Sequence, residues 1–190
     1  PATVIKADLW KLGQLKPGDR VHFVSVSRDF AEAEERRQEA WIEERRQPLI
    51  PELKGGGESS PILATLSPEE HPLGVIYRQA GEDYLLVEYG ELILDLNLRA
   101  RVHALMHALA EQAIPGVIEM TPGIRSLQIH FDNQRLPVNR LLDHLLGLEQ
   151  EIPDASALRF PTRIVRLPLS WDDEATRLAI QKYTQAVRKD

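Results

Sequence analysis

The sequence predicts an α+β fold of the ferredoxin-like kind, an α/β sandwich in which one sheet carries its helices on a single face. The first observation is the order of elements between residues 74 and 167, where β-rich runs and helical stretches follow one another as β-β-α-β-β-α-β. The second is that each helical stretch has one apolar stripe and so needs burial on one side only. A short β segment and a connector helix are expected before this unit.

Two hairpins account for four of the strands. GVIYRQ and YLLVEYG flank AGED at 80–83, a four-residue turn that contains a glycine. A second pair of β-rich runs flanks TPG at 121–123. In the last of these runs, alternation assigns three apolar residues to the buried face and three polar ones to the other. The apolar set is Leu127, Ile129 and Phe131, and the polar set is Ser126, Gln128 and His130.

Two helices follow from the 3.6-residue spacing of apolar positions. Asp95 is suited to cap the first, which runs to about Gln112, and Pro137 is suited to the first turn of the second. The run from Arg163 to Leu167 is then expected to return as the last strand. Periodicity predicts one core cluster made of Val102, Leu105, Met106, Leu109, Leu127, Ile129, Leu141, Leu142 and Leu145.

Residues 1–28 are predicted to form the short β segment. KPGD at 16–19 fits a type II turn, and the β-rich run at 21–26 follows it. Because the apolar residues of this segment have few partners nearby in the sequence, the chain is expected to be cut from something longer. The stripe of Val21 and Phe23 is expected to dock on the α/β unit, to pair with another copy of the chain, or to stay exposed.

A charged connector helix is predicted next. Asp29 and Glu32 have the spacing of a capping box, and the stretch from Phe30 to about Gln47 is rich in Ala, Glu and Arg. PELKGGGESSP at 51–61 follows, and its glycines and serines predict a flexible linker.

At the other end of the chain, Ser170 and Asp173 are predicted to cap a helix from Trp171 to about Lys189. The predicted divisions of the chain are 1–28, 29–73, 74–167 and 168–190.

Composition excludes several classes of function. Lys and Arg number 23 against 29 Asp and Glu, so the net charge of −6 does not favour nucleic acid or an anionic membrane as partner. The chain has no Cys, which excludes disulfides, thiolate catalysis and Cys-ligated zinc. It contains no apolar run of membrane-spanning length and does not start with a secretory signal pattern. A cytoplasmic location is therefore expected.

The histidines offer only one pair at metal-binding spacing. His103 and His107 lie four residues apart and so share a helix face, but they lack the intervening Glu of HExxH. They are expected to be surface residues. The remaining histidines, none close to a second His or a Cys in the sequence, are His22, His71, His130 and His144.

Other candidate groups have a structural and a functional interpretation. Alternation gives Arg125 the inward parity, with Glu88 or Glu119 as its partner, so it either braces a turn or binds an anion. SWDD at 170–173 pairs two carboxylates, and helix capping explains them better than acid/base catalysis. The glycines at 55–57 lack the spacing of a phosphate-binding loop. No catalytic, cofactor-binding or metal-binding residue is therefore assigned.

Two stretches carry a family resemblance. DLWKLGQLKPGDRVHFVSVS at 8–27 resembles the end of the KipA-like, allophanate hydrolase subunit 2 type of domain. YLLVEYG at 84–90, IPGVIEMTPGIRSL at 114–127 and the following HFD resemble the beginning of the KipI-like, allophanate hydrolase subunit 1 type. Both types on one chain in this order resemble the junction in urea carboxylase (urea amidolyase). RIVRLPLSWDDEATRLAIQKY at 163–183 is also similar to the urea carboxylase branch.

The resemblance implies a reaction for the parent protein and none for this chain alone. In that family, ATP with Mg²⁺ drives carboxylation of biotin, and the carboxyl group passes to urea to give allophanate. The implied partners are a biotin carboxylase, a biotin carrier domain and two cyclophilin-like barrels, and the resemblance places the barrels mainly before residue 1 and after residue 190. This chain has neither a biotin-carrying lysine site nor an ATP-binding segment of that family, so the implied role is structural and one of interaction with the other domains. The alternative is an assembly domain of the Kip regulatory or 5-oxoprolinase type.

Overall fold

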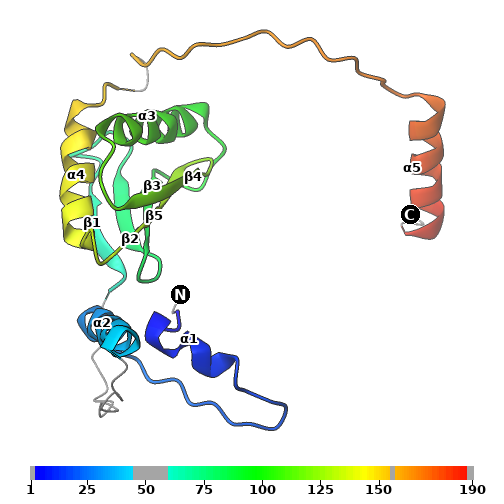
Figure 1. Cartoon of the computed structure of the whole chain (residues 1–190). Helices are drawn as coiled ribbons and strands as arrows, with labels where there is room; N and C mark the ends of the chain where they lie inside the picture. The colour runs from blue at the N-terminus through cyan, green and yellow to red at the C-terminus, as the bar shows by residue number, and fades with distance from the viewer. Residues whose placement is uncertain (1–2, 45–59, 155–156, 188–190) are drawn as a thin grey trace. The chain divides into compact units, whose positions relative to one another are not determined.

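Five antiparallel strands form one sheet in the computed structural model, which describes residues 3–44, 60–154 and 157–187. The sheet order is β1-β2-β3-β5-β4 (Figure 1). The strands are β1 (Ile62–Leu66), β2 (Val75–Gln79), β3 (Tyr84–Tyr89), β4 (Val117–Pro122) and β5 (Ser126–Phe131). The chain divides into two units, residues 1–158 and 159–190, and each is described by itself.

The long helices α3 (Leu96–Gln112) and α4 (Val138–Glu151) pack on one face of this sheet, since their apolar stripes share one core cluster with it. β5 pairs antiparallel with both β3 and β4, so β3 and β4 run parallel with β5 between them. The unit β3-α3-β4 is therefore a split β-α-β arrangement, as in ferredoxin-like folds. The predicted α+β class, both hairpins and both helices are confirmed.

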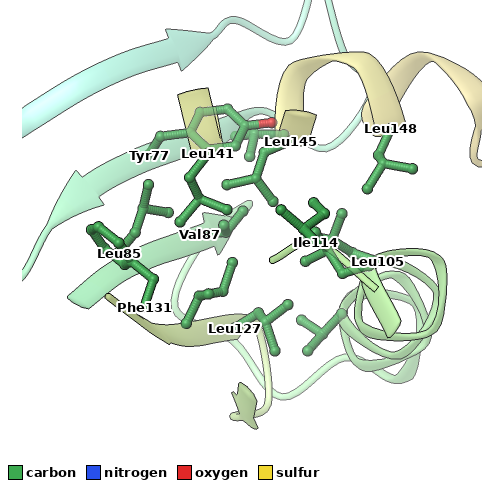
Figure 2. Close-up of a cluster of buried hydrophobic side chains, with 14 of the residues drawn as sticks. Tyr77, Leu85, Val87, Leu105, Ile114, Leu127, Phe131, Leu141, Leu145 and Leu148 are labelled. Carbon is green, nitrogen blue, oxygen red and sulfur yellow. The ribbon is translucent and has the colours of Figure 1, made fainter. Parts of the chain in front are cut away.

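The predicted core is also confirmed, and Figure 2 shows part of it. Cross-strand register explains the cluster, because Val87 of β3 lies opposite Tyr77 on one side and Leu127 on the other. All three side chains are fully buried. Of the nine predicted residues, seven are buried in the cluster, while Met106 and Leu142 are partly buried against it.

The predicted last strand of the fold, from Arg163 to Leu167, is wrong. The structure assigns no strand between Arg163 and Leu167, and Leu167 is 79% exposed. A β-rich run becomes a strand only where another strand pairs with it, and none of the described strands pairs with this one. The fifth strand is instead β1, which precedes residue 74 and pairs with β2. The assignment of residues 1–28, 29–73, 74–167 and 168–190 to separate parts of the parent protein stays a prediction.

The N-terminal segment is helical where a β segment was expected. Helix α1 (Lys6–Leu12) occupies its first part, and residues 21–26 form no strand. The missed signal is the spacing of Ile5, Leu9 and Leu12, which is helical and not alternating. The type II turn is confirmed, because Gly18 has φ 97° and the Asp19 N–H donates to the Lys16 carbonyl at 3.1 Å.

The connector helix is confirmed as α2 (Arg28–Glu44), but its cap differs from the prediction. The Phe30 N–H donates to Oγ of Ser27 at 3.3 Å, so Ser27 caps the helix and Asp29 lies in its first turn. The sequence pattern predicted the cap two residues too late, at Asp29, because Ser27 and Asp29 are both good capping residues. The predicted end of this helix and most of the glycine-rich stretch at 51–61 lie outside the described residues.

In the second unit, α5 (Glu174–Ala186) begins three residues later than the predicted start at Trp171. Asp173 caps it, because its Oδ1 accepts the Thr176 N–H at 2.7 Å and its Oδ2 accepts the Ser170 hydroxyl at 2.5 Å. These two hydrogen bonds, the Ser170 one first, lower the pKa of Asp173 to about 2. The capping interpretation of SWDD is therefore confirmed for Asp173, whereas Ser170 only donates to Asp173 and Asp172 pairs with Arg177.

Candidate functional site

A buried ionic hub lies where α3 meets the end of α4. Arg101 of α3 and Glu149 of α4 are 2% and 5% exposed. The Arg101 guanidinium donates to Oε2 of Glu149 from Nη2 at 2.5 Å and from Nε at 3.2 Å. It also donates to the carbonyls of Glu149, Ile152 and Pro153 at 2.9–3.0 Å. One side chain therefore neutralises a buried carboxylate and satisfies the last carbonyls of a helix.

Two further side chains complete the hub around Glu149. The hydroxyl of Tyr89 donates to Oε1, and Nε2 of His71 lies 3.4 Å from Oε2. The Leu73 N–H donates to Nδ1 of His71 at 3.4 Å, which assigns the proton of the neutral imidazole to Nε2, facing the carboxylate. Burial is the largest cause of the lowered pKa of His71, and Arg101 lowers it further, while Glu149 opposes both.

The hub is built for stability and not for proton transfer. Glu149 accepts from Arg101 and Tyr89 at once, so its charge is already compensated. Burial, and then Glu149, raise the pKa of Tyr89 well above its usual range, and this phenol stays protonated at neutral pH. Sequence reasoning missed the hub, although Arg101 stands between Leu98 and Leu105 in an apolar stripe, which is the signal that could have found it.

His71 makes the stability of this unit depend on pH. Its pKa is lower in the folded protein than the ordinary value of 6.5. The unfolded state therefore binds the proton more tightly, and the free energy of unfolding should fall as pH drops below about 6.5. Thermal melts between pH 8 and 5 should show this loss, with a smaller slope for His71→Gln. The exposed His144→Gln should keep the full slope, and equal slopes in all three proteins would contradict the assignment.

The open face of the sheet carries an ionic row centred on Glu88. Its Oε1 lies 2.9 Å from Nη2 of Arg125, and its Oε2 lies 3.0 Å from Nε of Arg78. Nη1 of Arg125 donates to the Gly90 carbonyl at 3.2 Å. Glu88 alternates with the core residues of β3 and therefore faces away from the core. Because Arg125 pairs with Glu88, it lies on the same open face. The predicted inward parity of Arg125 is therefore wrong. β5 begins only at Ser126, so strand alternation does not extend to residue 125.

Glu88, one of the two predicted partners, is thus the partner of Arg125, and the Arg125 guanidinium braces a turn.

The histidines that the sequence singled out form no catalytic arrangement in the described residues. The rings of His103 and His107 lie 4.4 Å apart in a T-shaped contact, and His130 stacks on Tyr84 at 4.6 Å. His22 and His144 are exposed. Within residues 3–44, 60–154 and 157–187, no group of three or more His, Asp and Glu side chains could hold a metal ion.

A second ionic cluster joins the N-terminal helices to the sheet. Nζ of Lys6 lies 2.7 Å from Oε1 of Glu35 on α2 and also pairs with Asp83 in the β2–β3 turn. The Lys6 N–H donates to Glu82 at 2.5 Å, and Nδ2 of Asn133 donates to Glu35 at 2.7 Å. Burial lowers the pKa of Lys6, but its hydrogen bonds to Asp83 and Glu35 outweigh this and raise it. The expected connector helix is therefore held in place through its buried Glu35.

Removing this ammonium should release the N-terminal helices. Lys6→Met leaves Glu35 and Asp83 without their cation, and three neighbouring carboxylates then repel one another. Amide hydrogen exchange in α1 and α2 should become faster, while α3 and α4 keep their protection. Lys11→Met, which removes only an exposed pair with Asp8, is the matched control. Unchanged exchange in α1 and α2 would show that other contacts hold them.

No helix in the described part of the chain is long and apolar enough to cross a membrane.

Comparison with known proteins relates the chain to one group. Residues 75–185 match the family model of the carboxyltransferase domain, subdomain C and D. The urea amidolyase of Lachancea kluyveri is 36% identical to this chain over 98% of its residues. The chain spans only 10% of the length of that curated relative.

Solved structures agree with this relationship. The crystal structure of the urea amidolyase of K. lactis matches 98% of this chain at 34% identity with a TM-score of 0.72, and the chain covers 12% of it. The crystal structure of the urea carboxylase of Kluyveromyces lactis gives 0.70 at 34% identity, again over 98% of this chain and 17% of that one. With more than half of its residues in the family match, the chain belongs to the carboxyltransferase-domain family, subdomains C and D.

Proposed function

We propose that this chain is a structural part of the carboxyltransferase region of an ATP- and biotin-dependent urea carboxylase, which makes allophanate from urea. The observation that carries the proposal is the similarity to urea amidolyase over 98% of the chain, together with the carboxyltransferase match over 75–185. The closed Arg101–Glu149 hub supports a structural role, because its charges are used to fix helices against the sheet.

Biotin and ATP with Mg²⁺ would supply the carboxylating chemistry of the parent protein, and neither the glycine run at 55–57 nor the guanidinium groups of Arg101 and Arg125 fit a phosphate group of ATP. The glycines at 55–57 lack phosphate-loop spacing. The buried guanidinium of Arg101 and the largely buried one of Arg125, which a phosphate would need free, are each paired with a carboxylate. We therefore assign both groups to other domains of the parent, which include the biotin carboxylase, the biotin carrier and the cyclophilin-like barrels. The proposed location is the cytoplasm.

The acceptor of the carboxyl group decides between this function and the Kip or 5-oxoprolinase alternative. ATP cleavage by the natural, longer protein should be stimulated by urea and abolished by avidin, which sequesters biotin. Stimulation by 5-oxoproline with no effect of avidin would support the alternative and overturn the proposal. The 190-residue chain alone should neither cleave ATP nor take carboxyl groups from carboxybiotin, and turnover that a point mutation within it removes would contradict its structural role.

A further inference from the structure

An apolar segment lies exposed between β3 and α3. Leu92, Leu94 and Leu96 are 87%, 85% and 83% exposed, and Ile93 is 55% exposed. A single exposed aliphatic side chain is ordinary, but four within five residues form a contiguous apolar surface of the kind that marks an interaction site. We call residues 92–96 the apolar segment.

The backbone on both sides of the apolar segment is anchored. The Gly90 N–H donates to the Gly74 carbonyl at 3.1 Å, and the Gly90 carbonyl accepts from Arg125 at 3.2 Å. Near the end of the segment, Asp95 caps α3 by accepting the Asn97 N–H at 2.7 Å. These contacts hold the backbone in a position that leaves the three leucines exposed to solvent.

Charge indicates what covers the segment. Glu91 precedes it, Asp95 lies within it, and no Lys or Arg occurs between residues 91 and 98. Two copies joined by a two-fold axis would place the same surface against itself and bring these carboxylates together, and each chain also carries a net charge of −6. An apolar surface with basic groups at its rim therefore suits the leucines better than a second copy of the chain does.

We propose that the apolar segment docks into an apolar groove with a basic rim on another domain of the same polypeptide. This inference rests on the proposed function, in which the chain is one part of a long multidomain protein. The chain spans only 10% of the curated urea amidolyase relative, so most of such a polypeptide lies outside the matched part. Covalent tethering gives a neighbouring domain a high effective concentration at the segment.

Thiol labelling tests the docking directly, because the chain contains no cysteine of its own. Leu94→Cys is placed in this chain and in the natural, longer protein, and mass spectrometry follows labelling of the peptide that contains residue 94. Labelling in the folded longer protein should be slower than in the chain alone by about tenfold or more, and equally fast in both once they are unfolded. Equal rates in the two folded proteins would overturn the proposal, as would slow labelling in the folded chain alone.

Sedimentation of the chain alone tests the rival occupant. The chain and its Leu92→Ser/Leu94→Ser variant should both sediment as monomers with the same melting temperature. A dimer that this variant abolishes would overturn the proposal in favour of a second copy. The two proposals fail separately. Slow labelling of the longer protein without urea-stimulated ATP cleavage would contradict only the proposed function. Fast labelling of a longer protein that carboxylates urea would contradict only the proposed docking.

Discussion

Replacing Arg101 by Met is expected to lower the free energy of unfolding of this chain by about 3–5 kcal/mol. The variant leaves the Glu149 carboxylate buried without its cation and strips the hydrogen bonds from the Ile152 and Pro153 carbonyls. Urea denaturation followed by far-ultraviolet circular dichroism measures the change. The loss is large because removing one partner of a buried pair costs much more than the pair itself contributes.

Two further variants separate the buried charge from the lost side-chain volume. Arg140→Met on the exposed side of α4 is the matched control and should change stability by no more than about 0.5 kcal/mol. The double variant Arg101→Met/Glu149→Leu removes both charges and should be more stable than Arg101→Met alone. If the double variant were the less stable of the two, the carboxylate would not be the source of the loss.

Leu127→Ala is expected to cost about 2–5 kcal/mol, through lost burial and the cavity left behind. Leu127 is fully buried in the middle of the sheet, where β5 pairs it with Val87 of β3. The same denaturation experiment measures the cost. Ile118→Ala on the edge strand β4, where the side chain is 59% exposed, is the control and should cost much less. A cost below about 1 kcal/mol for Leu127→Ala would mean that the core described here does not form.

Elements with a strong local pattern could be predicted from the sequence alone. The apolar stripes of α3 and α4 repeat over several turns, and both hairpins contain glycine turns between β-rich runs. Short β-rich runs outside these hairpins could not be predicted in this way. The five residues of β1 become a strand because they pair with β2, whereas the equally β-rich 163–167 run pairs with none of the described strands.

The hub depends on long-range contacts that periodicity does not reveal. Arg101 and Glu149 are separated by 48 positions, and Tyr89 is 60 positions from Glu149. Their meeting depends on how α3 and α4 pack together, which is a tertiary property. The capping role of Asp173 needs only neighbours within three residues, and the sequence predicted it. The position of Arg101 within an apolar stripe showed that a buried partner was needed, but not which one.

The most direct test of the central claim measures the two half-reactions of the natural, longer protein separately. Labelled bicarbonate reports carboxylation of biotin, and transfer of the label to urea reports the carboxyltransferase. If this chain belongs to the carboxyltransferase, Arg101→Met should slow transfer by about 100-fold through misplacement of neighbouring elements, while biotin carboxylation continues. Arg140→Met should leave both steps unchanged. Loss of biotin carboxylation with intact transfer from preformed carboxybiotin to urea would contradict the account.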